Sequence, residues 1–178
     1  MKGRSAATVV LALLGGAAIL AAAEIRVTPL VADGRVFASF SAPTALTDDA
    51  REVIRSGLPL TFRFDLALRR PSSVWLDRTL AEVTLAASVK FDNLTGVYQV
   101  SKLQDGRVVW SERTKQEAEV RTWMTTFERV SMHPAAPLEP NADYYVRVRL
   151  HASPKRTFSF WPWGRDDGSG RADFTFIR

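Results

Sequence analysis

Hydrophobic and polar residues alternate with a period of two along much of this chain. In the clearest segment, residues 60–68, leucine and phenylalanine alternate with threonine, arginine, aspartate and alanine. Residues 82–91, 144–150 and 173–177 repeat the pattern. Successive side chains of a strand point to opposite faces, so this alternation predicts strands with one buried face and one wet face.

Two Asp-Gly pairs predict tight turns between such segments. Asp33-Gly34 and Asp105-Gly106 supply the positive φ angles that a type I′ turn requires. They predict two hairpins, which join residues 25–32 to 35–41 and residues 96–104 to 107–112.

Two segments depart from the period of two and predict helices. Residues 47–56 begin with Thr47, a good N-cap, and end before Gly57, which suits the C′ position. Residues 115–131 overlap a capping-box sequence, TKQE at 114–117, and place apolar residues on one helical stripe. That stripe fits a partner helix or, as we expect, the domain's own sheet.

These elements together predict a mainly β fold. We expect a single antiparallel β-sandwich or flattened barrel with the two helices packed against it. The proline-rich residues 133–140 predict a stiff connector rather than a domain boundary, because too little chain follows them to fold alone. One domain is therefore expected over residues 24–178.

The first 23 residues have the three-part pattern of a secretory signal peptide. Lys2 and Arg4 precede an uncharged stretch that ends in three alanines at 21–23. This predicts export to the periplasm or envelope of a bacterium. The stretch is also about 20 residues long, enough to span a bilayer, so the alternative is a retained N-terminal anchor on the same side of the membrane.

Composition narrows the class of protein further. Hydrophobic residues make up 46% of the 178, which excludes a disordered chain. Without Lys2 and Arg4, 22 basic residues face 19 acidic ones, an excess too mild to indicate nucleic acid. The absence of cysteine excludes disulfides, thiolate metal sites and a lipoprotein anchor.

No catalytic, cofactor or metal motif stands out. His133 lies in the proline-rich connector, and His151 ends a strand on its wet face, with no second histidine at helical spacing. Neither a glycine-rich phosphate loop nor a G-x-S-x-G elbow occurs. We expect no enzymatic activity, no cofactor and no metal.

Basic side chains line the wet faces of two predicted strands. Arg63 and Arg69 share one face, with Arg70 next along the chain, and Arg147 and Arg149 share another. If the strands are neighbours, they form a cationic patch suited to an anionic lipid headgroup or an acidic partner. The alternative is a solvated face paired with nearby carboxylates.

The remaining candidate binding residues form two clusters that contain tryptophan. Arg69, Arg70, Trp75 and Asp77 would sit together at a strand end, as a site or as a corner in which Trp75 packs and Asp77 pairs with an arginine.

Trp161 and Trp163 flank a proline before the polar residues 166–170, which are expected to form a loop. We predict that these tryptophans contact a membrane interface or a partner protein, the alternative being a plug that closes the core.

Four blocks of sequence resemble an uncharacterised family of exported bacterial proteins, catalogued as a domain of unknown function. They are SGLPLTF at 56–62, LRR and VWLD at 68–77, LTGVYQV at 94–100, and YYVRVRL at 144–150. In the third block, Gly96 and Gln99 replace arginines that are usual in that family. The resemblance implies export and a single domain, and it implies no activity and no catalytic residue.

Two functions from different classes follow from these features. The first is an exported, non-catalytic envelope module that binds a protein or a membrane surface. The second is a carrier of a small, lipid-like ligand, or an enzyme, that uses the β interior. A continuous apolar core favours the first, and an internal cavity of about 300 Å³ or more favours the second.

The signal peptide generates a first prediction. The mature protein is expected to begin at Glu24, because small residues occupy the positions before it. N-terminal sequencing of protein from the envelope measures this directly. An intact Met1 on membrane-embedded protein would establish an anchor instead.

Overall fold

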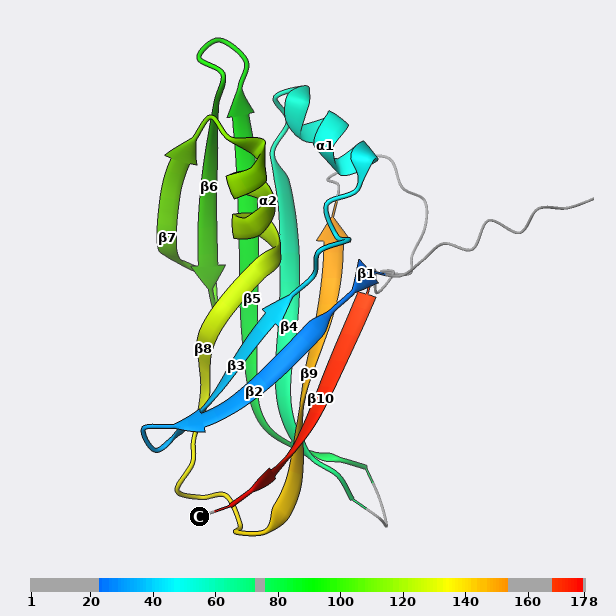
Figure 1. Ribbon diagram of the computed structural model, residues 1–178, viewed down its shortest axis with the longest axis vertical. Coiled ribbons are helices and arrows are strands. Elements are labelled where there is room, and N and C mark those ends of the chain that lie inside the picture. The colour runs from blue at the N-terminus through cyan, green and yellow to red at the C-terminus, as the bar shows by residue number, and fades with distance from the viewer. Residues whose placement is uncertain (1–22, 73–75, 154–167, 178) are drawn as a thin grey trace, which may run out of the picture.

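The protein folds as two β-sheets packed face to face, with two short helices at one end (Figure 1). The computed structural model describes residues 23–72, 76–153 and 168–177. The elements are β1 (Ala23–Glu24), β2 (Arg26–Ala32), β3 (Arg35–Ser41), α1 (Asp48–Arg55), β4 (Leu60–Arg70), β5 (Arg78–Asp92), β6 (Val97–Gln104), β7 (Arg107–Thr114), α2 (Glu117–Thr125), β8 (Thr126–Pro134), β9 (Ala142–Ser153) and β10 (Gly168–Phe176).

The larger sheet has seven strands in the order β1-β10-β9-β4-β5-β6-β7, and the smaller one has the order β2-β3-β8. All neighbours are antiparallel except β1 and β10. The mainly β fold with two helices is confirmed, and of the two predicted forms the structure is the sandwich.

The alternation along β4 sets the two faces of the larger sheet. Phe62, Phe64 and Leu66 are all at most 1% exposed and point toward the smaller sheet, whereas Arg63 is exposed on the opposite face. Across the interior, the rings of Phe40 and Phe127 lie 5.0 and 5.3 Å from that of Phe64. This aromatic cluster joins the two sheets.

Both predicted hairpins are confirmed. β2 pairs with β3, and β6 pairs with β7, each across a two-residue turn. The turn residues have the expected left-handed backbone, with φ of 50° and 69° at Asp33 and Gly34 and of 48° and 80° at Asp105 and Gly106. Local chemistry was therefore sufficient to fix these turns.

The first helix matches its prediction closely. The Thr47 side chain accepts a hydrogen bond from the Ala50 backbone and caps α1, and Gly57 follows the helix with a φ of 82°. Lack of space at Gly57 also favours glycine, because a Cβ added there would lie 3.1 Å from the Asn93 side chain.

The second helix was predicted too long. The sequence predicted residues 115–131, but α2 ends at Thr125 and β8 continues the chain to Pro134. Arg129 has a φ of 49° in a bulge where two residues of β8 face one of β3, so Phe127 and Val130 both point inward. A bulge thus produces the three-residue spacing of a helix within a strand.

The capping box at 114–117 is also wrong in its details. The N-cap is Gln116, without a side-chain hydrogen bond, while Thr114 accepts from the Gln116 backbone and donates to Glu119. Likewise, the connector predicted at 133–140 begins later, because His133 and Pro134 end β8.

The predicted loop at 166–170 is corrected in part, because Gly168 already begins β10. Gly168 and Gly170 are buried beside the start of the domain. A Cβ on Gly170 would lie 2.4 Å from the carbonyl oxygen of Ile25, so only glycine fits there. Close approach of two backbones, rather than loop flexibility, explains this glycine.

The predicted signal peptide lies outside the described residues except for Ala23. Ala23 and Glu24 form β1, which pairs with β10, and the Glu24 backbone donates to the Thr44 hydroxyl. None of the helices in the described part of the chain is long and apolar enough to cross a membrane.

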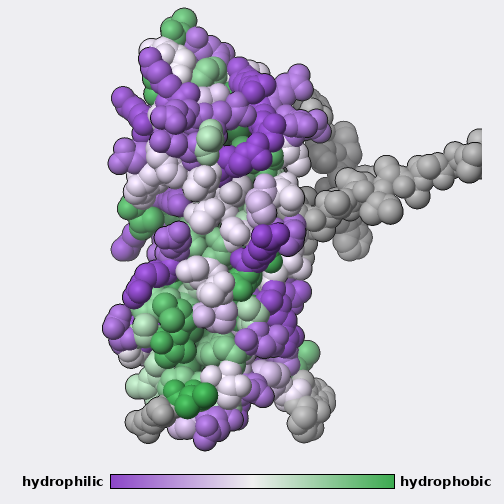
Figure 2. Space-filling model, viewed as in Figure 1, coloured by the Kyte–Doolittle hydropathy of each residue, from purple (hydrophilic) through white to green (hydrophobic). Residues whose placement is uncertain are grey.

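Figure 2 shows the molecule from the side of the smaller sheet, and hydrophobic side chains gather over its lower part, where the β2–β3 hairpin lies. The outer face of the larger sheet lies on the opposite side. Leu30 and Val31 of β2 are exposed hydrophobic residues of the smaller sheet.

Phe64 provides a test of the core. Phe64→Asp should lower the free energy of unfolding by several kcal/mol, about 4 or more, because it places a charge among apolar side chains. Arg63→Gln, one residue away on the wet face, should cost about 1 kcal/mol or less. Urea denaturation measures both, and equal effects would contradict the face assignment.

Candidate functional site

The two predicted arginine rows lie on neighbouring strands. β4 pairs with β9, so that Asp65 lies opposite Arg149 and Ala67 lies opposite Arg147. Residues opposite each other in a sheet share a face, so both rows point outward from the larger sheet. The two strands that carry the arginines are therefore neighbours, as a cationic patch requires.

Other strands enlarge this patch. Arg171 of β10 lies opposite Arg147, and Lys90 of β5 shares a cross-strand row with Gln99 and Arg113. We call the charged outer surface the arginine face. It consists of seven basic residues and four acidic ones: Arg63, Arg69, Lys90, Arg113, Arg147, Arg149, Arg171, Asp65, Glu82, Asp143 and Asp173.

Only part of this charge is paired. Arg63 Nε lies 3.1 Å from Asp65, whose other oxygen lies 3.1 Å from His151 Nε2, and Arg171 pairs with Asp173 at 2.6 Å. Within the described residues, Arg147 and Arg149 form no ion pair. The predicted alternative of a fully paired face therefore holds for Arg63 but not for β9.

A hollow of about 210 Å³ lies over Ala67, between the arginine rows, and we call it the Ala67 hollow. Its lining includes Arg63, Asp65, Ala67, Arg69, Glu82, Arg147 and Arg149. The Nε atoms of Arg69 and Arg149 are buried and have no hydrogen-bond partner among the described residues. Buried donors are normally paired, so two orphans in one hollow are unusual.

Of the predicted cluster of Arg69, Arg70, Trp75 and Asp77, three residues lie in the described structure. Arg69 and Arg70 are consecutive in β4, and Arg70 pairs with Glu139 of the connector before β9. Asp77 accepts hydrogen bonds from Tyr145 and the Ser72 backbone, which lower its pKa, and the charge of Arg69 nearby lowers it further. Trp75 lies outside the described residues.

Sequence reasoning missed Tyr145 as part of this region. Its hydroxyl donates to Asp77 at 2.6 Å, and the Arg171 guanidinium lies 3.8 Å from its ring centre. This hydrogen bond is the main cause of the lowered pKa of Asp77, while burial and then Asp77 raise the pKa of Tyr145. The sequence did contain a signal for it, because the period of two places Tyr145 on the same strand face as Arg147 and Arg149.

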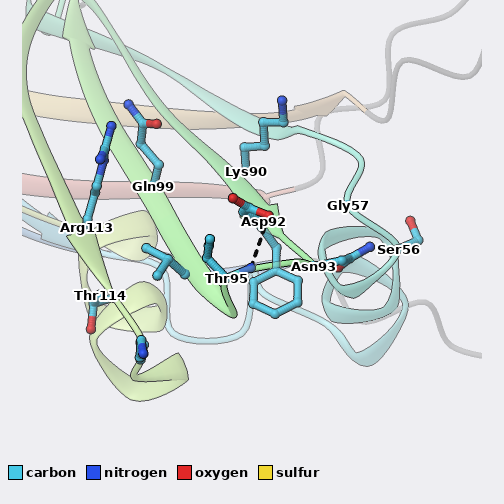
Figure 3. Close-up of a pocket in the computed structure, with 12 residues that line it drawn as sticks. Ser56, Gly57, Lys90, Asp92, Asn93, Thr95, Gln99, Arg113 and Thr114 are labelled. Carbon is cyan, nitrogen blue, oxygen red and sulfur yellow. Dashed lines mark hydrogen bonds between the residues drawn. The ribbon is translucent and has the colours of Figure 1, made fainter.

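A second hollow, of about 1030 Å³, opens at the end of the β5–β6 hairpin beside α1 (Figure 3). Lys90, Gln99 and Arg113 extend from three neighbouring strands in the same direction. Asp92 accepts hydrogen bonds from the Leu94 and Thr95 backbones, which lower its pKa. Its carboxylate is thus engaged in the turn, and the basic side chains dominate the hollow.

Lys102 is a further residue that the alternation did not identify. It points inward from β6, where its Nζ donates to the Thr126 carbonyl at 2.8 Å and lies 4.6 Å from the Phe127 ring centre. Burial lowers its pKa. Because its charge contacts the junction of α2 and β8, we assign it a structural role.

Trp161 and Trp163 lie outside the described residues, so their predicted surface contact stays a prediction. His151 is placed beside Asp65 on the arginine face, while His133 lies near the end of β8.

The Tyr145–Asp77 hydrogen bond predicts a pH effect. A carboxylate with a lowered pKa stabilises the fold at neutral pH, and this contribution is lost as the pH falls through the folded-state pKa. Tyr145→Phe should raise the pKa of Asp77, so its stability deficit should be largest near neutral pH and shrink below about pH 4. Thermal denaturation between pH 3 and 7 measures this.

Tyr144→Phe is the matched control, since the Tyr144 hydroxyl accepts from the Glu139 backbone and has no carboxylate partner in the described structure. Its deficit should not vary with pH in that range. The same pH dependence in both variants would contradict the assignment.

Comparison with known proteins gives one match. No curated protein and no solved structure matches the chain. A family model described as Domain of unknown function (DUF4390) matches residues 20–156, which include β1 to β9. This agrees with the family resemblance of the sequence blocks. The chain therefore belongs to the family Domain of unknown function (DUF4390).

Proposed function

We propose that this protein is an exported, non-catalytic module of the bacterial envelope that binds an acidic partner protein through its arginine face. The observation that carries the proposal is the excess of unpaired basic charge on one sheet surface. Seven basic residues face four acidic ones there, whereas residues 24–178 as a whole carry 22 and 19.

The size of the arginine face suits a protein interface. Strand spacing places β10 and β7 about 24 Å apart, and Glu82 and Lys90 are about 27 Å apart along β5. The resulting area, roughly 650 Å², approaches the roughly 800 Å² that each partner contributes to a standard interface. A folded partner with an acidic surface can therefore cover most of it.

The pattern of residues favours a protein over a membrane. Four carboxylates share this face with the basic residues, and a membrane surface of uniform negative charge would repel them. The large exposed hydrophobic residues that could enter a bilayer lie in loops, on edge strands or near chain ends: Leu30, Val31, Leu58, Leu76, Leu94, Val108, Val109 and Ile177. They leave the middle of the face polar.

The interior gives less support to the alternative of a small-ligand carrier or enzyme. Phe40, Phe64 and Phe127 fill the space between the sheets with ring centres 5.0 to 5.3 Å apart. The hollow between α1 and α2 measures about 10 Å³. Three larger ones, of about 1030, 390 and 210 Å³, open on the outside of the larger sheet. A surface site therefore explains the charged residues better.

Binding to immobilised polyglutamate tests the proposal. The double variant Arg147→Gln/Arg149→Gln should bind about tenfold more weakly than the unchanged protein, if each contact contributes about 0.7 kcal/mol. Raising the salt concentration should weaken binding of the unchanged protein, because the contacts are ionic.

The control variant Arg107→Gln/Arg121→Gln removes the same charge from exposed positions at the β6–β7 turn and on α2. It should bind nearly as well as the unchanged protein. Equal losses in both double variants would refute a specific face. Binding to vesicles of phosphatidylglycerol without binding to polyglutamate would refute the protein partner in favour of a membrane.

A further inference from the structure

The Ala67 hollow has a simple origin in the sheet. Ala67 of β4 lies between Arg147 of β9 and Glu82 of β5, which are its direct cross-strand neighbours. A methyl group surrounded by long side chains leaves a depression whose floor is the sheet itself. The depression measures about 210 Å³, below the 300–1,000 Å³ typical of sites for whole ligands, so it fits one functional group.

Two arginine Nε–H groups at this hollow lack hydrogen-bond partners among the described residues. Arg69 and Arg149 each keep a buried Nε–H group without an acceptor among the described residues. Arg51 Nε is also buried without a hydrogen bond, but its guanidinium pairs with Asp48 at 2.7 Å. The two arginines at the hollow form no such ion pair within the described structure.

The carboxylates near the hollow do not pair with these two Nε–H groups. Asp65 lies opposite Arg149, but its oxygens contact Arg63, Thr84 and His151. Glu82 is exposed at the rim and forms no ion pair within the described residues. Its charge would oppose an incoming anion.

We infer that the Ala67 hollow is an oxyanion site, in which Arg69 and Arg149 hold a single carboxylate or phosphate group with Arg147 at the rim. A guanidinium presents its N–H groups as a planar fork that matches two oxygens of such a group. The inference rests on the arginine face of the proposed function and adds the chemical group that the face recognises.

Arginine side-chain NMR tests the site. Sodium phosphate and sodium acetate are titrated into the ¹⁵N-labelled protein at constant ionic strength, with chloride as the balancing anion. The Nε–H signals of Arg69 and Arg149 should shift and saturate, while that of Arg121, which lies on α2 away from the arginine face, should not. Saturation by acetate alone assigns the site to carboxylates, and saturation by phosphate alone assigns it to phosphate groups.

Two variants separate the hollow from general charge. Ala67→Leu fills the hollow without altering any charge and should abolish the saturable shift. Ala86→Leu is the control. Ala86 lies on β5, on the same outer face of the sheet but outside the lining of the hollow, so this variant should leave the saturable shift intact. Arg149→Lys keeps the charge but removes the fork, so it should weaken binding even if Ala67→Leu proves unstable.

Removal of the competing carboxylate should act in the opposite direction, so Glu82→Gln should strengthen phosphate binding. The inference fails if the shifts are linear and shared by all arginines, or if folded Ala67→Leu binds like the unchanged protein. Polyglutamate binding is a separate readout. If the unchanged protein does not bind polyglutamate but phosphate still saturates the arginine signals, the acidic partner protein is refuted and the oxyanion site is retained.

Discussion

The buried row of β4 is the constraint on which the rest of the structure depends. Phe62, Phe64 and Leu66 pack between the two sheets, and Phe64 contacts an aromatic residue from each of β3 and β8. A shift of one residue in the pairing would bury the alternate residues instead, including Arg63. The free energy of burying this row therefore fixes which side chains face solvent, and with them the arginine face.

The arginine face is an arrangement that folding by itself does not favour. Arg147 and Arg171 lie directly opposite each other on neighbouring strands, and like charges in such pairs destabilise a sheet. Partial compensation comes from Asp173 and from the Tyr145 ring beneath Arg171. A surface that keeps repelling charges together, with two buried donors unpaired, is more consistent with binding an anion than with stability alone.

Other charged groups hold separate segments of the fold together. Lys102 is half-buried near Phe127 and donates to the carbonyl at the junction of α2 and β8, so its charge is held by a specific contact. Tyr145 similarly fixes Asp77, which in turn accepts from the Ser72 backbone in the β4–β5 connection. These contacts join segments that are distant in sequence, whereas the hollows over Ala67 and beside α1 lie on the outer surface.

The sequence by itself determined the features that depend on neighbouring residues. Alternation predicted the buried face of β4, Asp-Gly pairs predicted both hairpins, and Thr47 with Gly57 delimited α1, because backbone geometry and capping act over a few residues. Strand pairing was decided only in the tertiary structure. Pairing brought the arginines of β4 and β9 together, placed Tyr145 against Asp77, and imposed the bulge that turned residues 126–131 from the predicted helix into β8. Each of these outcomes depends on contacts between distant residues, which a period along one segment does not contain.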